Sequence, residues 1–139
     1  MFRLFSGVMS AFALLSSALA VAQVVPVNGG AIHGSAWNGS FLFRGIPFAA
    51  PPVEDLRWNP PQPVIAWKGV RDATAQPASC VQNDQGWNYS DYAIGKEDCL
   101  TLDVRTPSMS GKLPVLVWIH GGSNRAGGPN DIEIGRAHV

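Results

Sequence analysis

One short segment, residues 114–119, constrains the fold of this chain more than any other part of its sequence. It reads Pro-Val-Leu-Val-Trp-Ile, is apolar at every position, and lies between a turn-forming stretch at 107–111 and a pair of glycines. A continuous apolar run rich in β-forming residues, with turn signals on both sides, is typical of a strand buried on both faces. The segment therefore predicts such a strand.

The apolar run leads directly into His120-Gly121-Gly122, which Ser123 follows. Because glycine has no side chain, an oxygen of another molecule can come close to the backbone N–H groups of such a turn. Two N–H donors aimed in advance stabilise the oxygen that becomes negative during ester hydrolysis. A His-Gly-Gly turn after a strand is typical of the oxyanion hole of lipases and esterases.

Two Asn-Gly pairs organise the first part of the sequence. Apolar runs at 24–27 and 31–34 lie on either side of the pair at 28–29 and predict a β-hairpin. The second pair, at 38–39, precedes a third predicted strand at 41–46.

The middle of the sequence contains an extended loop and one more strand. Residues 47–63 are too rich in proline for a sheet or a helix, but they carry embedded aromatic and apolar side chains. This combination predicts an ordered extended loop rather than a linker. Residues 100–104 alternate apolar and polar side chains, as a half-buried strand does.

The amino terminus has the pattern of a cleaved secretory signal. Arg3 precedes an apolar stretch at 8–15, and small residues suited to signal peptidase follow at 18–22. The alternative is a membrane anchor, but the apolar core is shorter than the roughly 20 residues that a spanning helix needs. We therefore expect a signal peptide at 1–22, a secreted or periplasmic protein, and no stable membrane insertion after cleavage.

Export gives a meaning to Cys80 and Cys99, which are the only cysteines of the chain. An oxidising compartment favours a disulfide between them, and the alternative is two buried free thiols. Closing a loop of this size stabilises a fold by about 3 kcal/mol in the chain-entropy account.

The last residues, 133–139, have a different origin from the rest in our interpretation. Their back-translation closely resembles a widely used sequencing-library adapter that continues into a stop codon. We treat them as an adapter-derived tail, so His138 is no catalytic candidate, and we expect the natural protein to continue past Ile132.

Charge and histidine content exclude several classes of function. The formal net charge is zero, whereas a nucleic-acid-binding face would be basic. Outside the tail the only histidines are His33 and His120. Two isolated histidines do not make a metal site of the usual ligand count, and we expect no cofactor.

Four stretches together resemble the amino-terminal part of the type-B carboxylesterases, the cholinesterase-like members of the α/β-hydrolase fold. They occur in family order and cover nearly all of residues 23–132. They are Phe43-Arg44-Gly45-Ile46-Pro47-Phe48-Ala49-Ala50-Pro51-Pro52; Leu56-Arg57-Trp58 with Pro60-Pro61, followed by Trp67 and Val70-Arg71-Asp72-Ala73; Glu97-Asp98-Cys99-Leu100-Thr101-Leu102-Asp103-Val104; and Pro114-Val115-Leu116-Val117-Trp118-Ile119-His120-Gly121-Gly122.

The resemblance implies an α/β fold class, with a β-hairpin and the first strands of a central sheet at 23–132. It implies that Gly121, Gly122 and Ser123 form the oxyanion-hole turn, with the backbone N–H groups of the last two as donors and His120 ordering the loop. It also implies that Cys80 and Cys99 form the first disulfide of the family.

The resemblance also implies one salt bridge, and two positions of the sequence depart from the family pattern. Arg44 and Glu97 resemble a structural salt-bridge pair of the family. Ser123 stands where the family more often has a third glycine, so its side chain is expected to crowd the acyl group. Arg105 stands where an apolar residue is usual, and we expect it to be tolerated at a strand end.

Ser123 is not the expected nucleophile, because a nucleophile elbow requires Gly-x-Ser-x-Gly and no such sequence occurs in the chain. The resemblance implies a serine esterase that hydrolyses small carboxylic esters through an acyl-enzyme, with its Ser, acid and His further along the protein. The 139 residues alone are expected to be inactive.

Two alternatives stay open at this point. Some relatives of this family are non-catalytic binding or adhesion proteins, and a downstream Gly-x-Ser-x-Gly would distinguish an enzyme from them. A small stand-alone binding protein is the other alternative, and it requires the tail at 133–139 to be natural.

Overall fold

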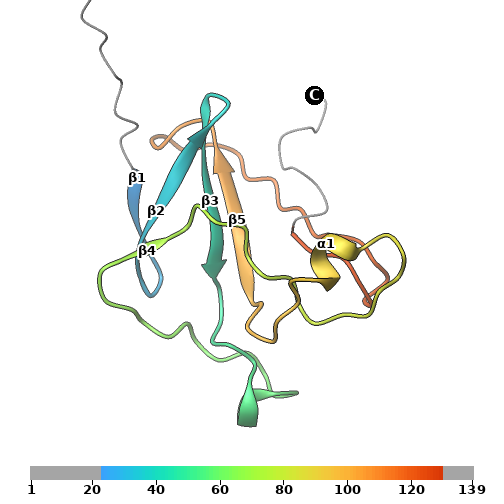
Figure 1. Ribbon diagram of the computed structural model, residues 1–139. Coiled ribbons are helices and arrows are strands. Elements are labelled where there is room, and N and C mark those ends of the chain that lie inside the picture. Colours follow the sequence, from blue (N-terminus) through green and yellow to red (C-terminus); the bar gives the residue numbers. More distant parts are fainter. Residues whose placement is uncertain (1–22, 130–139) are drawn as a thin grey trace, which may run out of the picture.

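The computed structural model describes residues 23–129, and its sheet is organised around strand β2 (Gly30–Trp37) (Figure 1). The first half of β2 pairs antiparallel with β1 (Gln23–Val27) and parallel with β4 (Val70–Asp72). Its second half pairs antiparallel with β3 (Ser40–Pro47), which in turn pairs with β5 (Thr101–Thr106). Strands that lie far apart in the sequence, such as β1 and β5, therefore share one sheet.

Both Asn-Gly pairs make the tight turns that the sequence predicts. Gly29, Asn38 and Gly39 have φ angles of 105°, 45° and 71°. This left-handed region suits the hairpin turns that Asn-Gly favours. The predicted hairpin and third strand are confirmed.

A small core lies where β2, β3 and the residue after β4 meet. Ile32, Phe43 and Ala73 are almost completely buried, and partly buried apolar side chains pack around them. Burying a side chain such as Ile32 or Phe43 stabilises the fold by roughly 1.5–3 kcal/mol. Trp67 packs against this core, and its Nε1–H donates a hydrogen bond to the carbonyl oxygen of Ala31 at 2.9 Å.

Strand β5 confirms the strand predicted from residue 100 onward. Its pairing with β3 shifts register between Phe43 and Ile46, where Gly45 has a φ of 65°. The backbone N–H of Gly45 donates to Oδ1 of Asp103 at 2.9 Å. A bulge of this kind bends the strand and redirects its side chains.

The proline-rich segment is an extended loop, as predicted, but two of the aromatic side chains expected to pack in it, Phe48 and Trp58, are exposed. Its first residue, Pro47, ends β3 opposite Thr101. The rest contains one short 3-10 helix, η1 (Glu54–Leu56), and pairs with no strand of residues 23–129. Backbone hydrogen bonds tie its start to the sheet and to itself, from Phe48 to Leu100 at 3.1 Å and from Ala50 to Gln62 at 3.0 Å.

The prediction of a doubly buried strand at 114–119 is wrong for this structure. The segment pairs with none of the strands in residues 23–129, and Val115, Leu116 and Ile119 are 85%, 88% and 83% exposed. A strand forms only where a neighbour accepts its hydrogen bonds, and a buried one also needs layers that cover it. Within the described range no element supplies either.

Other predictions fall on residues outside the description. The signal peptide at 1–22 and the tail at 133–139 both lie there. In the part of the chain that is described, no helix has the length and apolar character needed to cross a bilayer.

Candidate functional site

The backbone conformation of the turn at 122–126 requires glycine at its first position. Gly122 has a φ of 116°, and Ser123 and Asn124 both have a φ of 55°. The carbonyl oxygen of Gly122 accepts the N–H groups of Arg125 and Ala126 at 3.0 and 3.2 Å. A Cβ added to Gly122 would lie 1.8 Å from the carbonyl oxygen of Ala126, so any side chain would open the turn.

The predicted donors are not used by the fold in the described range. Among residues 23–129, no hydrogen bond engages the backbone N–H of Gly122 or Ser123. Gly121 and Ser123 are exposed and Gly122 is half-buried. Nδ1 of His120 lies 2.9 Å from the carbonyl oxygen of Gly121, so this ring contacts its own loop.

A cavity of about 570 Å³ lies beside this turn. His120 and Asn124, on either side of the three candidate residues, both line it. The start of β5 and the disulfide also line it, together with Trp118, Ile119, the residues after the turn, Phe48 and residues 79–82. Gly121, Gly122 and Ser123 do not line the cavity themselves, so its mainly apolar side chains lie near the two unused N–H donors and not directly against them.

Asp103 is the ionisable side chain of β5 in this cavity. Burial raises the pKa of its carboxyl group, and the Gly45 N–H and the charge of Arg44 oppose that rise. The Asp103 carboxylate therefore stabilises the bulge between β3 and β5 by accepting the Gly45 N–H, and it is not a freely exposed charge.

The disulfide between Cys80 and Cys99 is present, with Cα atoms 5.0 Å apart. It confirms the predicted pairing and connects the loop at 80–99 to the residue two before β5. The loop carries a short helix, α1 (Tyr89–Tyr92), and Figure 1 shows α1 beside the red segment that follows the turn.

Polar side chains of this loop hold the segment after the turn. Both amide atoms of Gln82 bond to the backbone of Gly127: Nε2 donates to the carbonyl oxygen at 3.0 Å, and Oε1 accepts the N–H at 2.7 Å. Ser79 donates a hydrogen bond to Asp91, and a Cβ added to Gly128 would lie 2.3 Å from Asp91 Oδ1. Residues 126–128 are buried here.

Sequence reasoning missed this contact, because no motif marks Gln82 or Asp91, and the Asn-x-Ser glycosylation sequence that begins at Asn88 says nothing about it. Asn88 and Asp91 are completely buried although they are polar, and each lies in a segment that reads as an ordinary surface loop. Only the fold brings them to residues 126–128.

The predicted pair of Arg44 and Glu97 does not form. Glu97 instead contacts Arg57, with 3.0 Å between Oε1 and Nη1, because the proline-rich loop brings Arg57 to it. Arg105, the other unusual position, stacks its guanidinium 4.3 Å from the centre of the Trp37 ring and donates from Nε to Ser40 at 2.9 Å. These contacts explain why a charge is tolerated there.

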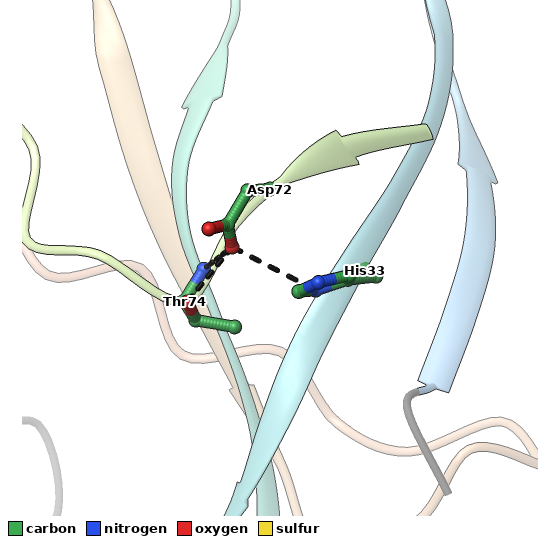
Figure 2. Close-up of polar contacts among 3 residues, drawn as sticks. All are labelled: His33, Asp72 and Thr74. Carbon is green, nitrogen blue, oxygen red and sulfur yellow. Dashed lines mark hydrogen bonds and ion pairs between the residues drawn. The ribbon is translucent and has the colours of Figure 1, made fainter. Parts of the chain in front are cut away.

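His33, the other histidine of the described residues, lies in a separate polar group with Asp72 and Thr74 (Figure 2). Oδ1 of Asp72 accepts the N–H and Oγ1–H of Thr74 at 2.9 and 2.7 Å, and it lies 3.7 Å from Nδ1 of His33. The Thr74 hydrogen bonds, and to a smaller degree His33, hold the pKa of Asp72 below its usual value. Since the hydroxyl contacts the carboxylate and not the imidazole, the group is not a nucleophile–base pair.

No group of three potential metal ligands occurs in residues 23–129. What the described site can do is limited to backbone donation beside a cavity. It contains no nucleophile placed against a base.

Comparison with known proteins identifies the family to which this architecture belongs. The carboxylesterase family profile matches residues 21–136. The pyrethroid hydrolase Ces2e of Rattus norvegicus is 44% identical over 108 residues, which are 69% of this chain and 19% of that protein. The phenmedipham hydrolase of Pseudarthrobacter oxydans is 41% identical over 114 residues, 77% of this chain and 23% of that protein.

The fold gives the same result. A solved structure of a PNB esterase superposes with a TM-score of 0.71 at 37% identity, over 77% of this chain and 23% of that one. Its likeness confirms the α/β-hydrolase fold class, of which the described residues form a sheet-rich part. The chain spans about a fifth of the length of these relatives. It belongs to the carboxylesterase family.

Proposed function

We propose that the protein containing these residues is a serine esterase that hydrolyses small carboxylic esters, and that the turn at 121–123 is its oxyanion hole. The observation that carries the proposal is the turn itself. It belongs to a family motif, requires glycine at position 122, and leaves two adjacent N–H groups without a partner in the described range, while its neighbours His120 and Asn124 line a largely apolar cavity.

The proposed chemistry uses these donors at one step. A serine attacks the ester carbonyl carbon, the carbonyl oxygen becomes an oxyanion, and the N–H groups of Gly122 and Ser123 donate hydrogen bonds to it. The intermediate collapses to an acyl-enzyme as the alcohol leaves, and water releases the acid in a second addition through the same hole. Because these residues contain no Gly-x-Ser-x-Gly, we propose that another part of the protein supplies the nucleophile, and we expect the 139 residues alone to be inactive.

The proposal includes export to an oxidising compartment, periplasmic or extracellular. The signal-like pattern at 1–22 and the disulfide between Cys80 and Cys99 support it.

Replacing Gly122 tests the oxyanion hole. In the full-length protein we expect Gly122→Ala to lower kcat for a p-nitrophenyl ester by about 10²–10³-fold, the usual effect of losing a donor. The added methyl group would collide with Ala126 and displace both N–H groups.

Gly39→Ala is the matched control. Gly39 also has a positive φ, of 71°, but a Cβ there meets nothing within 4 Å, so the substitution adds the same kind of backbone strain far from the turn. It should leave kcat within a few-fold of the parent. Equal losses in both variants would refute the role of the turn, and a parent that cannot hydrolyse esters would favour a binding protein.

A further inference from the structure

Gln82 forms an unusually complete contact with the chain that follows the oxyanion turn. Its Nε2 donates to the carbonyl oxygen of Gly127 and its Oε1 accepts the N–H of the same residue, at 3.0 and 2.7 Å. A primary amide is the side chain that can both donate and accept in this way, as a neighbouring strand would. Gly127 is buried, so both of its backbone groups depend on Gln82.

The orientation of this amide is fixed by its own neighbours. Asn88, which is completely buried, donates from Nδ2 to Oε1 of Gln82 at 2.9 Å. Asn88 is itself held, because its Oδ1 accepts the N–H of Gln85 at 2.7 Å and its Nδ2 also donates to the carbonyl oxygen of Asn83 at 2.9 Å. Oε1 of Gln82 therefore faces two N–H donors, and Nε2 faces the carbonyl oxygens of Gly127 and Cys80.

A continuous chain of contacts joins this amide to the turn. Gly127 follows Ala126, whose N–H donates to the carbonyl oxygen of Gly122 at 3.2 Å. On the other side Gln82 lies two residues from Cys80, whose disulfide anchors the loop beside β5. The turn is thus connected to the sheet through Gln82, whereas the segment before it, 113–121, pairs with no strand in residues 23–129.

We propose that Gln82 is a positioning residue for catalysis, which sets the direction of the Gly122 and Ser123 N–H groups through its two bonds to Gly127. The inference rests on the proposed esterase function. Donors of an oxyanion hole act at about 2.7–3.1 Å from the developing charge, and a displacement of about 1 Å can cost about 10²-fold in rate. The effect should appear in the transition state and not in substrate binding.

The test compares variants of the full-length enzyme with a p-nitrophenyl ester. Gln82→Ala should lower kcat by about 10- to 100-fold, change KM by less than about threefold, and weaken binding of a trifluoromethyl ketone, which forms a tetrahedral oxyanion, by the same factor as kcat/KM. Replacing a residue that only stabilised the fold would leave the affinity for the trifluoromethyl ketone unchanged.

Ser40→Ala supplies the control for lost stability. Ser40 is also buried and exchanges two hydrogen bonds, with Trp37 and Arg105, but it lies in β3 away from the turn. It should lower the thermal midpoint as Gln82→Ala does, with kcat and inhibitor binding unchanged.

Gln82→Glu gives an independent readout through pH. An ionised carboxylate accepts the Gly127 N–H but repels the Gly127 carbonyl oxygen, whereas a protonated one can donate to it. The activity of Q82E relative to the parent should therefore rise as the pH falls. An active parent whose Q82A variant keeps kcat and inhibitor affinity would overturn this inference alone, and an inactive parent would overturn the esterase function and this inference with it.

Discussion

At the scale of single residues, Ser123 is the position where this turn departs most from its family. Its φ of 55° is unfavourable for any residue with a side chain, and glycine would adopt it without strain. Ser123 is also one of the two residues whose backbone N–H groups are the proposed donors, so its hydroxymethyl side chain lies close to that N–H group. A substitution here therefore tests both the strain and the crowding that the sequence suggested.

We expect Ser123→Gly to raise the free energy of unfolding of the full-length protein by about 1 kcal/mol, because relief of the left-handed strain exceeds the added entropy of the unfolded chain. We also expect it to speed hydrolysis of long-chain p-nitrophenyl esters relative to the acetate. Asn124→Gly is the matched control, since Asn124 has the same φ but is not a proposed donor. If both variants change the ester preference equally, crowding by Ser123 is wrong.

At the scale of elements, one exposed carboxylate lies where β4 pairs with β2. Asp72 ends β4 and accepts two hydrogen bonds from Thr74 beside His33 of β2. Because the folded-state pKa of Asp72 is lowered from 3.8, its ionised form stabilises the fold above that value. This contribution disappears as the pH falls through the lowered pKa.

Urea unfolding of the parent and of Asp72→Asn at several pH values measures this effect. The parent should have the higher midpoint at neutral pH, and the difference should shrink below pH 3.8. Thr74→Val, which removes the larger hydrogen bond and keeps the side-chain shape, should reduce the difference at neutral pH. A difference that is constant with pH would show that the charge of Asp72 does not matter.

The elements also show which structure can be predicted from sequence. The hairpins depend on Asn-Gly turns, whose signal is local, and they were predicted correctly. Strand β4 was missed, because Val70–Asp72 has no alternation of its own and forms only by pairing with β2. The segment 114–119 has a strong strand pattern, but the described range holds no partner for it.

At the scale of the whole molecule, the described residues form a sheet, an anchored turn and an apolar segment that lies in solvent. Val115 to Val117 and Ile119 are largely exposed, and a contiguous apolar surface of this kind is normally covered by other chain. The relatives are about five times as long as the matched part. The candidate turn was predictable because its motif is contiguous, whereas its anchoring by Gln82 required the fold.

The most direct test of the central claim is a genomic read through the codon for Ile132 and onward. The esterase account predicts that the genomic reading frame continues after Ile132 with other codons in place of the adapter-like tail and encodes a Gly-x-Ser-x-Gly motif, which supplies the nucleophile that residues 1–139 lack. A frame that continues without that serine, or a gene that ends at Val139, would contradict the account.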